Sequence, residues 1–480
     1  METIPLRLTF DDVLLEPRHS KIKSRLETRV ETYLTKDIKL NIPIISANMD
    51  AITESRMAIS MARLGGLGVI HRFIAPEIQA QEVLKVKRSE GFIIENPITI
   101  SPKNSLGEAK TLGGKYGISG ILIVGEKNRL LGIVTRRDMA YQPKECDKKP
   151  VTYFMTKKLI TASPNITIKQ AKNILIKNKI EKLPLVNRKG TLCGLITLSD
   201  IVKKEKFTHS STDKKGRLLA AAAVGIKDED ISRAEMLVKA GVDILVVDIA
   251  HGHSDLAINM IKKLKKKFPH VPIIGGNVAT AKGVTDLVKA GADGIKIGIG
   301  PGSTCTTRIV AGVGVPQISA IFECFKQAKK TNTPLIADGG IRYPGDVAKA
   351  IAAGASSVMI GSLLAGTDES PGLLINKDGV NYKITRGMAS LGANLTRQTI
   401  NSQHKISQEN IDAVVPEGVE AMVQYKGKTK DIVSRLLGGL RSSMSYLGAK
   451  NIKEMQTKAK FIRITPSGLK ESHPHDVIKL

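Results

Sequence analysis

One cysteine of the chain lies in a setting that suits chemistry better than packing. Cys305 follows three glycines within five residues, and its neighbours are Ser303, Thr304, Thr306 and Arg308. Structural cysteines normally lie in apolar runs, whereas glycines permit a tight backbone that can carry a side chain into a site. Arg308 favours the thiolate, which is the reactive form. The sequence therefore predicts a nucleophile at Cys305; a buried, inert thiol is the alternative.

Two further glycine-containing segments predict a site for an anion. Asp338-Gly339-Gly340 and Gly361-Ser362 each follow a short apolar run. Because these glycines lack a Cβ, their backbone N–H groups can approach a phosphate closely. The Asp338 carboxylate can accept hydrogen bonds from the two hydroxyls of a ribose. Together these segments predict a cradle for a nucleoside monophosphate.

The segments that precede these residues predict buried strands separated by helices. Continuous apolar runs are typical of strands covered on both faces of a parallel sheet. Eight alternating units predict an α/β fold, a (β/α)8 TIM barrel formed by residues 1–92 and 210–480. The predicted strands are Pro43–Ile45, Leu67–Ile70, Leu219–Val224, Ile244–Val247, Ile273–Gly275, Gly294–Ile297, Leu335–Ala337 and Ser357–Ile360. The predicted helices include Asp230–Ala240, Asp255–Phe268, Thr280–Ala290 and Pro344–Ala353. An open doubly wound sheet is the alternative, but no G-x-G-x-x-G opens a helix.

The active site of a TIM barrel lies at the carboxyl ends of its strands. All predicted strands but the third end in polar or glycine residues, which include Ser46–Asp50, His71-Arg72, Asp248, His251 and Asn277. His251 and His253 could suggest a metal, but no cluster of carboxylates accompanies them. We therefore interpret them as loop residues.

Residues 93–209 contain an internal repeat with a constant offset of 62 residues. Leu131–Asp138 recurs as Cys193–Asp200, and Ser101-Pro102 recurs as Ser163-Pro164. A fixed offset indicates a duplicated supersecondary unit. Each copy, 93–150 and 151–209, predicts a strand, a helix, two further strands and a helix that starts at the final Asp.

This repeat resembles a pair of CBS domains inserted after the second βα unit of the barrel. The resemblance implies that the Thr-x-x-Asp segment of each copy holds the ribose and phosphate of an adenine nucleotide, and that a purine nucleotide is the effector. The residues concerned are Thr135, Asp138, Thr197 and Asp200. Simple capping of the last helix by these residues is the alternative.

Composition narrows the class of protein further. The chain has 480 residues, a net charge of +28 and 4% aromatic residues. Lysines are spread along the whole chain, and the run Lys262–Lys267 predicts a solvated helix face; a nucleic-acid surface is the alternative, weakened by the few aromatic side chains. Four separated cysteines argue against disulfides and zinc, and Cys324 follows apolar residues, so we expect it in the core.

No segment is long and apolar enough to predict a membrane span, and Met1–Phe10 does not have the pattern of a signal peptide. We therefore expect a cytoplasmic protein that binds neither membrane nor nucleic acid. The C-terminal Ile478-Lys479-Leu480 is a weak neighbour of the peroxisomal Ser-Lys-Leu signal; an ordinary C-terminus is the alternative.

The motifs as a set resemble the IMP dehydrogenase / GMP reductase family over essentially the whole chain. They are G-I-G-P-G-S-T-C-T-T-R at 298–308, I-A-D-G-G at 336–340, M-I-G-S at 359–362 and the C-terminal E-S-H-P-H at 471–475. The resemblance implies covalent catalysis, in which Cys305 adds to C2 of a 6-oxopurine ribonucleotide beside a nicotinamide cofactor. It also implies a homotetramer, with an octamer as the alternative.

The resemblance also implies roles for individual residues. Substrate-binding residues would be Ser46, Met49, Asn277, Ser303, Asp338, Gly339, Gly340, Gly361, Ser362, Gly387, Met388, Ser390 and Glu417. Cofactor-binding residues would be Asp248, Gly298 and Gly300. A K⁺ ion would be held by carbonyls of Gly300, Gly302 and Cys305, helped by Glu471, Ser472 and His473 of a neighbouring subunit.

Two reactions remain possible for such a site. A dehydrogenase passes hydride from IMP to NAD⁺ and then hydrolyses the intermediate to XMP, using an Arg-Tyr pair on a flap as base. A reductase expels ammonia from GMP and takes hydride from NADPH, and the family gives its proton transfer to a Thr and a Glu. We expect those to be Thr307 and Glu369, with Arg72 at a position where reductases usually have Lys.

The flap region, 391–415, contains no Arg-Tyr; its single arginine is Arg397, followed by Gln398. Loss of a catalytic base costs on the order of 10²–10⁴ in rate. Against this stand the Pro416–Glu420 segment and the repeat, which are commoner among dehydrogenases. We favour an NADPH-dependent GMP reductase, and an NAD-dependent IMP dehydrogenase is the alternative.

Overall fold

The computed structural model describes residues 4–89, 93–401 and 415–477. Its contacts divide the chain into two compact units. One comprises Met1–Ser89, His209–Asp213 and Leu218–Leu480; the other comprises Glu90–Thr208 and Lys214–Arg217. The larger is called here the barrel unit and the smaller the repeat unit.

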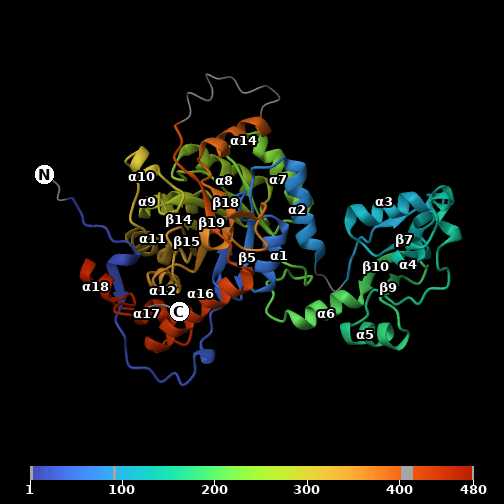
Figure 1. The fold of residues 1–480 in the computed structure, drawn as a ribbon, viewed down its shortest axis with the longest axis horizontal. Helices are drawn as coiled ribbons and strands as arrows, with labels where there is room; N and C mark the ends of the chain where they lie inside the picture. Colours follow the sequence, from blue (N-terminus) through green and yellow to red (C-terminus); the bar gives the residue numbers. More distant parts are fainter. Residues whose placement is uncertain (1–3, 90–92, 402–414, 478–480) are drawn as a thin grey trace. The chain divides into compact units, whose positions relative to one another are not determined.

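The barrel unit is a TIM barrel, as the apolar runs predicted (Figure 1). Eight parallel strands close in the order β11-β12-β13-β14-β15-β16-β4-β5. The strands are β4 (Ile44–Ser46), β5 (Leu67–Ile70), β11 (Ala221–Val224), β12 (Ile244–Val247), β13 (Ile273–Val278), β14 (Gly294–Ile297), β15 (Leu335–Asp338) and β16 (Ser357–Ile360). All eight predicted strands are present, with ends that differ by at most three residues.

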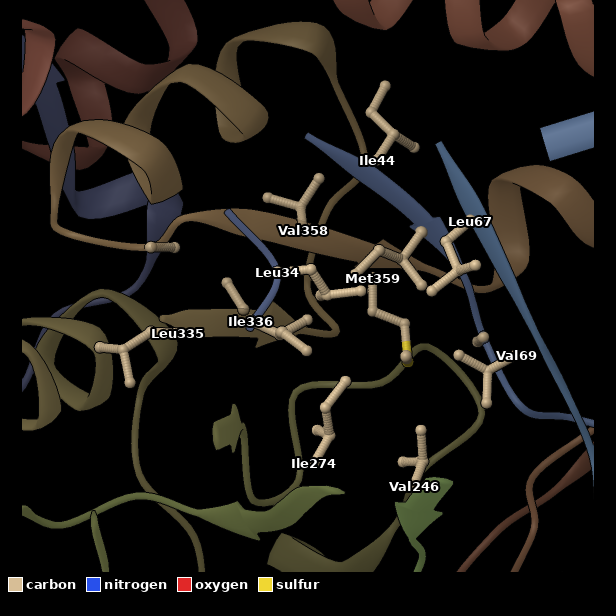
Figure 2. Close-up of a cluster of buried hydrophobic side chains, with 14 of the residues drawn as sticks. Leu34, Ile44, Leu67, Val69, Val246, Ile274, Leu335, Ile336, Val358 and Met359 are labelled. Carbon is tan, nitrogen blue, oxygen red and sulfur yellow. The ribbon is translucent and has the colours of Figure 1, made fainter. Parts of the chain in front are cut away.

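The barrel closes around a dense apolar core. Every residue of β5, β11, β12, β14 and β16 is buried, as expected of strands covered on both faces. Figure 2 shows part of this core, with Val69, Val246, Ile274, Ile336 and Met359 among its labelled side chains. Burial of such side chains contributes about 1.5–3 kcal/mol each, so the core fixes where the strand ends lie.

Helices follow the strands and cover the barrel. They are α1 (Ser55–Arg63), α2 (Pro76–Ser89), α7 (Glu229–Lys239), α8 (Asp255–Lys267), α9 (Ala281–Lys289), α10 (Thr307–Val310), α11 (Gln317–Thr331), α12 (Pro344–Ala352) and α13 (Ser362–Ala365). The four helices predicted above agree to within one residue at each end. Gly241, Gly291 and Gly354, which follow three of them, have φ of +90°, +106° and +123°, the region that glycine adopts most readily.

The remaining elements of this unit lie outside the eightfold pattern. An antiparallel sheet contains β17 (Ile375–Lys377), β18 (Val380–Arg386) and β19 (Glu420–Gln424), while β1 (Val13–Leu15) pairs with β20 (Phe461–Arg463) and β2 (Thr32–Tyr33) with β3 (Lys39–Leu40). The further helices are α14 (Leu391–Asn401), α16 (Thr429–Tyr446), α17 (Ile452–Lys458) and α18 (Pro466–Glu471).

The repeat unit preserves the offset of the sequence. Its first copy contains β6 (Thr99–Ile100), α3 (Leu106–Tyr116), β7 (Gly120–Val124), β8 (Leu130–Thr135) and α4 (Arg136–Ala140). The second contains α5 (Ile168–Lys177), β9 (Lys182–Val186), β10 (Leu192–Thr197) and α6 (Leu198–Lys206). Every shared element starts 62 residues later in the second copy. The predicted first strand of that copy is reduced to one bridge, Ala162 to Leu185, and α4 and α6 begin two residues before the predicted Asp.

Leu122, Ile133, Leu192 and Leu195 form one apolar cluster that joins the two copies. No helix in the described ranges of the chain could cross a membrane.

Candidate active site

A pocket lies at the carboxyl ends of the barrel strands, where the fold predicts one. Its walls come from the segments after β4, β14, β15 and β16 and from β18. Seven residues predicted to bind substrate line it: Met49, Ser303, Asp338, Gly339, Gly340, Gly361 and Ser362. Gly302, Thr304 and Thr385 complete the polar lining. The cysteine loop, through Gly302–Thr304, and the phosphate cradle therefore line the same cavity, whereas Cys305 itself is not among the residues that line it.

Close packing of glycines joins the cysteine loop to the phosphate cradle. Gly339 has φ of +91°, and a Cβ built on it would lie 3.0 Å from Pro301 Cγ and 3.2 Å from the Gly302 backbone N. Side chains are strained in this region of φ. A larger residue at 339 would thus push the two loops apart.

Cys305 is half-buried, and its Sγ lies 3.2 Å from the Thr307 hydroxyl. Arg308 does not contact the sulfur by hydrogen bond; its guanidinium donates to the carbonyls of Ile299 and Val315. Burial lowers the pKa of this guanidinium, and the attraction of Cys305 opposes that shift. Arg308 thus holds the loop in shape and contributes positive charge near the thiol.

Three segments far apart in sequence interlock at the cysteine. The backbone N–H of Val419 donates to Thr304 O (2.9 Å), that of Thr306 donates to Glu417 O (3.0 Å), and that of Gly387 donates to Val419 O (3.0 Å). A Cβ on Gly387 would lie 2.8 Å from Thr304 O. The structure therefore brings the predicted Gly387–Ser390 segment and Glu417 against the cysteine loop. The rest of the predicted flap, 402–414, lies outside the described residues.

Arg386 clamps two walls of the pocket together. Its Nε donates to Asp50 Oδ2 at 2.8 Å, and its Nη2 bonds the same oxygen and Thr396 of α14. This ties the segment after β4 to the strand that leads into Gly387 and Met388. Sequence reasoning missed the pair, because nothing local links positions 336 residues apart.

Lys296 is a second residue that sequence reasoning missed. It lies in β14, its side chain is 4% exposed, and its Nζ donates to Asp338 Oδ2 (2.7 Å) and to Asn277 Oδ1. Asn277 Nδ2 in turn donates to Gly298 O (2.8 Å) and Asp338 Oδ2 (3.0 Å). One signal was available: Lys296 is a charge within an otherwise apolar buried strand, and such charges need partners.

The structure gives two predicted site residues other partners. Ser46 is fully buried, and its hydroxyl accepts from Thr53 (2.8 Å), so Ala47 and Met49 line the pocket in its place. Glu369 Oε2 accepts from the backbone N–H of Thr429 at 2.9 Å, at the start of α16. Its described hydrogen bond therefore leads to a helix end, where a carboxylate is stabilised, and not to Thr307.

The residues predicted for the cofactor fall into two groups. Asp248 Oδ2 accepts from Arg72 Nε (3.1 Å), so it lies beside a residue that was predicted to be catalytic, and both side chains are partly exposed at strand ends. Gly298 and Gly300 serve loop packing, because a Cβ on them would lie 2.2 Å from Asp338 O and 2.6 Å from Arg308 Cγ.

The remaining predictions for ions and histidines concern the loops and the C-terminal tail. The Gly302 carbonyl accepts from Cys305 N, and His473 lies against Tyr343 of the same chain, so K⁺ binding stays a prediction. His253 pairs with Asp286 (2.9 Å), and no set of three His, Cys, Asp or Glu side chains in the described part of the chain could hold a metal. Cys324 is fully buried, as expected, and burial raises the pKa of its thiol to about 12.

In the repeat unit both Thr-x-x-Asp segments bond internally. Asp138 Oδ2 accepts from the Thr135 N–H (2.7 Å) and hydroxyl (2.8 Å), and Asp200 Oδ2 accepts from the Thr197 hydroxyl (2.6 Å). Each Asp lies at the third position of a helix that follows its Thr. Helix capping is therefore realised in both copies.

The barrel carries a half-buried cysteine among glycine loops at its carboxyl end, and comparisons with known proteins identify its family. Residues 7–475 match the model of the IMP dehydrogenase / GMP reductase domain. The chain is 54% identical to the inosine-5′-monophosphate dehydrogenase of Aquifex aeolicus over 98% of this chain and 95% of that protein. It is 49% identical to that of Nitrosopumilus maritimus, over 98% of both.

Among solved structures, a cysteine-to-alanine variant of the Trypanosoma brucei GMP reductase with guanosine 5′-monophosphate superimposes with a TM-score of 0.91. The two chains are 46% identical, and 99% of each is covered. The same reductase with guanosine 5′-triphosphate gives a TM-score of 0.80 at 42% identity, covering 96% of this chain and 99% of that one. This chain belongs to the IMP dehydrogenase / GMP reductase family and is an oxidoreductase.

Proposed function

We propose that the chain is an NADPH-dependent GMP reductase, which converts GMP to IMP and ammonia. The observation that carries this proposal is the missing Arg-Tyr pair in residues 391–415, without which the hydrolytic half of the dehydrogenase reaction has no strong base. Likeness to the T. brucei GMP reductase, at a TM-score of 0.91, supports it.

In this proposal the pocket holds GMP by its two ends. Gly339, Gly340, Gly361 and Ser362 surround the phosphate with backbone N–H groups, and Asp338 accepts from the ribose hydroxyls. The Gly387–Ser390 segment reads the base edge. The Gly387–Ser390 segment packs against Thr304 of the cysteine loop, so a base bound there would present C2 to Cys305.

Cys305 then acts as the nucleophile. Its thiolate adds to C2, the exocyclic nitrogen takes a proton and leaves as ammonia, and a thioimidate remains on the sulfur. When bound, NADPH supplies the hydride that reduces C2. The C–S bond breaks, its electron pair returns to Cys305, and IMP is released. With both protons counted, GMP, NADPH and 2 H⁺ give IMP, NADP⁺ and NH₄⁺.

We propose that Thr307 and Glu417, and not Glu369, deliver the proton to the leaving nitrogen. The Thr307 hydroxyl lies 3.2 Å from Cys305 Sγ, and the backbone carbonyl of Glu417 accepts from the N–H of Thr306, so the backbone of Glu417 lies against the cysteine loop. Glu369 instead bonds the start of α16. A general acid must lie within hydrogen-bond reach of the proton's destination, which favours the residue beside the cysteine loop.

We propose that the nicotinamide cofactor binds beside the Arg72–Asp248 pair, at the ends of strands that do not line the substrate pocket. Asp248 would accept from cofactor hydroxyls, and Arg72 would hold its carboxylate in place.

An IMP dehydrogenase that uses NAD⁺ is the second candidate. It is favoured by the 54% identity to the Aquifex aeolicus dehydrogenase, which exceeds the 46% identity to the trypanosomal reductase. Overall identity reports ancestry, whereas loss of one base changes the rate by on the order of 10²–10⁴. We therefore give the missing pair more weight.

One assay at 340 nm separates the two reactions. With GMP and NADPH, a reductase lowers the absorbance and forms IMP and ammonium in equal amounts. With IMP and NAD⁺, a dehydrogenase raises the absorbance and forms XMP. Because the flap has no Arg-Tyr base, we expect GMP reduction to be at least 10²-fold faster than IMP oxidation. If XMP formation is the faster reaction, the assignment is reversed.

We also propose that the repeat unit binds a purine nucleotide through Thr135, Asp138, Thr197 and Asp200. The GTP complex of the trypanosomal reductase supports a nucleoside triphosphate as the probe to test.

A further inference from the structure

Lys296 is a buried charge that the proposed mechanism does not use. It lies in β14, the strand that leads into the cysteine loop, and the other members of this strand are Gly294, Ile295 and Ile297. Its side chain is 4% exposed. A buried ammonium requires close partners, so the atoms that Lys296 contacts define what it can do.

The contacts of Lys296 all lead to one edge of the pocket. Its Nζ donates to Asp338 Oδ2 at 2.7 Å, and Asn277 Nδ2 donates to the same oxygen at 3.0 Å. Two donors therefore converge on Oδ2. Asp338 also lines the pocket and is 22% exposed. This arrangement turns the second oxygen, Oδ1, into the atom that can accept from a ligand.

Lys296 also sets the orientation of the Asn277 amide. Because Nζ donates to Asn277 Oδ1, the amide nitrogen must face Gly298 O, at 2.8 Å, and Asp338. With Lys296 replaced by an apolar residue, the amide could turn over, and Asp338 would lose both donors.

The backbone of Asp338 is held by a different residue. Gln317 Nε2 donates to Asp338 O (3.1 Å) and to Ile297 O (3.0 Å), and Gln317 is fully buried. Removal of Lys296 should therefore release the carboxylate while the strand end stays in place. That separation allows a specific effect to be told from a general loss of structure.

We propose that Lys296 is a positioning residue, which aims Asp338 Oδ1 at the ribose hydroxyls of the bound nucleotide through its bond to Oδ2. This inference rests on the proposed nucleotide site but holds for either direction of the reaction. The competing explanation is a buried counter-ion that stabilises the barrel and has no influence on recognition.

The test compares nucleotides with and without the ribose diol. Binding of GMP and of 2′,3′-dideoxy-GMP is measured by isothermal titration for the wild type, Lys296→Met and Asp338→Asn. A hydrogen bond to a charged acceptor contributes about tenfold or more to affinity. We expect Lys296→Met to lower the affinity for GMP by at least tenfold and the affinity for dideoxy-GMP by less than threefold, so that the preference for the diol disappears.

Lys87→Met is the matched control. Lys87 is equally buried, and its Nζ bonds Asp213 (2.9 Å) and Asp243 (2.7 Å). Asp243 precedes β12, at the opposite end of the strands from the pocket. This variant should lose thermal stability and keep the full preference for GMP. If folded Lys296→Met keeps that preference too, the inference is overturned.

The outcome separates this inference from the proposed function. If Asp338→Asn itself keeps the preference for GMP, the ribose role of Asp338 fails, and the proposed site fails with it. If Asp338→Asn loses the preference but Lys296→Met retains it, only the role of Lys296 fails.

Should Lys296→Met not fold, Lys296→Met/Asp338→Asn removes the buried charge pair as a whole. Its ratio of GMP to dideoxy-GMP affinity should equal that of Asp338→Asn, because Lys296 acts on the ribose through that carboxylate. A further fall in the ratio beyond threefold would show that Lys296 acts by another route and would overturn the inference.

Discussion

The barrel mouth and the repeat unit both contain polar motifs with an aspartate, but the partners of these aspartates differ. In the repeat unit, Asp138 and Asp200 bond the threonines three residues before them. At the barrel mouth, Asp338 bonds Lys296 and Asn277, which are 42 and 61 residues away. Because these hydrogen bonds lie within each Thr-x-x-Asp segment, the repeat motifs can stabilise the helix starts without a ligand.

The difference shows which motifs carry functional information. A Thr-x-x-Asp segment is explained by the helix that it caps, so its presence alone says little about a nucleotide. The convergence of strand ends on Asp338 and Cys305 has no such local explanation. It brings the Asp338 carboxylate and the Lys296 ammonium together at one edge of the pocket.

Among variants of the two regions, replacement of Cys305 should have the largest effect on turnover. We expect Cys305→Ser to lower the turnover of GMP and NADPH by at least on the order of 10³-fold, because a hydroxyl is a far weaker nucleophile than a thiolate at neutral pH. The affinity for GMP should stay within threefold. Cys193→Ser, in the repeat unit, is the control and should keep full activity. If Cys305→Ser turns over near the wild-type rate, the proposed covalent step is wrong.

A pair of glutamate variants should have the next largest effect. Glu417→Gln is expected to lower kcat by about 10²–10⁴, the range for loss of a general acid. Glu369→Gln should change kcat by less than threefold and lower stability by about 0.3–1 kcal/mol, because its carboxylate lies at the start of α16. Rates from stopped-flow NADPH oxidation and melting curves together distinguish the two; the reverse pattern would return the acid role to Glu369.

Features with a local cause could be predicted from the sequence. The barrel strands follow from short apolar runs such as Leu67–Ile70, and the helix ends follow from Ala-Gly pairs such as 240–241. The offset of the repeat predicted the spacing of β7 and β9, which start 62 residues apart. The glycines before Cys305 predicted a tight loop, and in the structure a Cβ on Gly298 would lie only 2.2 Å from Asp338 O.

Features with a long-range cause could not be predicted. The Arg386–Asp50 pair joins positions 336 residues apart. Lys296 is recognisable in the sequence as a charge within an apolar strand, but its partners Asp338 and Asn277 are not. Glu369 lies in a plausible motif, and only the fold reveals that Thr429 is its partner. Ser46 follows a strand end as site residues do, but its side chain points to Thr53. In each case tertiary packing determines where the side chain points and which residue it contacts.

The smallest expected effect concerns the caps of the repeat unit. Asp138→Ala removes the acceptor of two hydrogen bonds from Thr135 and should cost about 1 kcal/mol of stability in that unit. Urea unfolding followed by circular dichroism suits a chain with no Trp. Barrel turnover without effector should stay unchanged, because the bonds lost are internal to one helix start.

The same variant decides between capping alone and nucleotide binding. If Asp138 and Asp200 also hold the ribose of a nucleotide, Asp138→Ala and Asp200→Ala should each weaken GTP binding by about tenfold, the value of a hydrogen bond to a charged acceptor. The Ser105 cap of α3 provides the matched control, since Ser105→Ala loses a comparable bond to the Glu108 N–H at a helix start outside the two Thr-x-x-Asp segments. Equal GTP affinity in all three variants would leave the repeat motifs with a structural role only, and the contrast with the barrel mouth would then be complete.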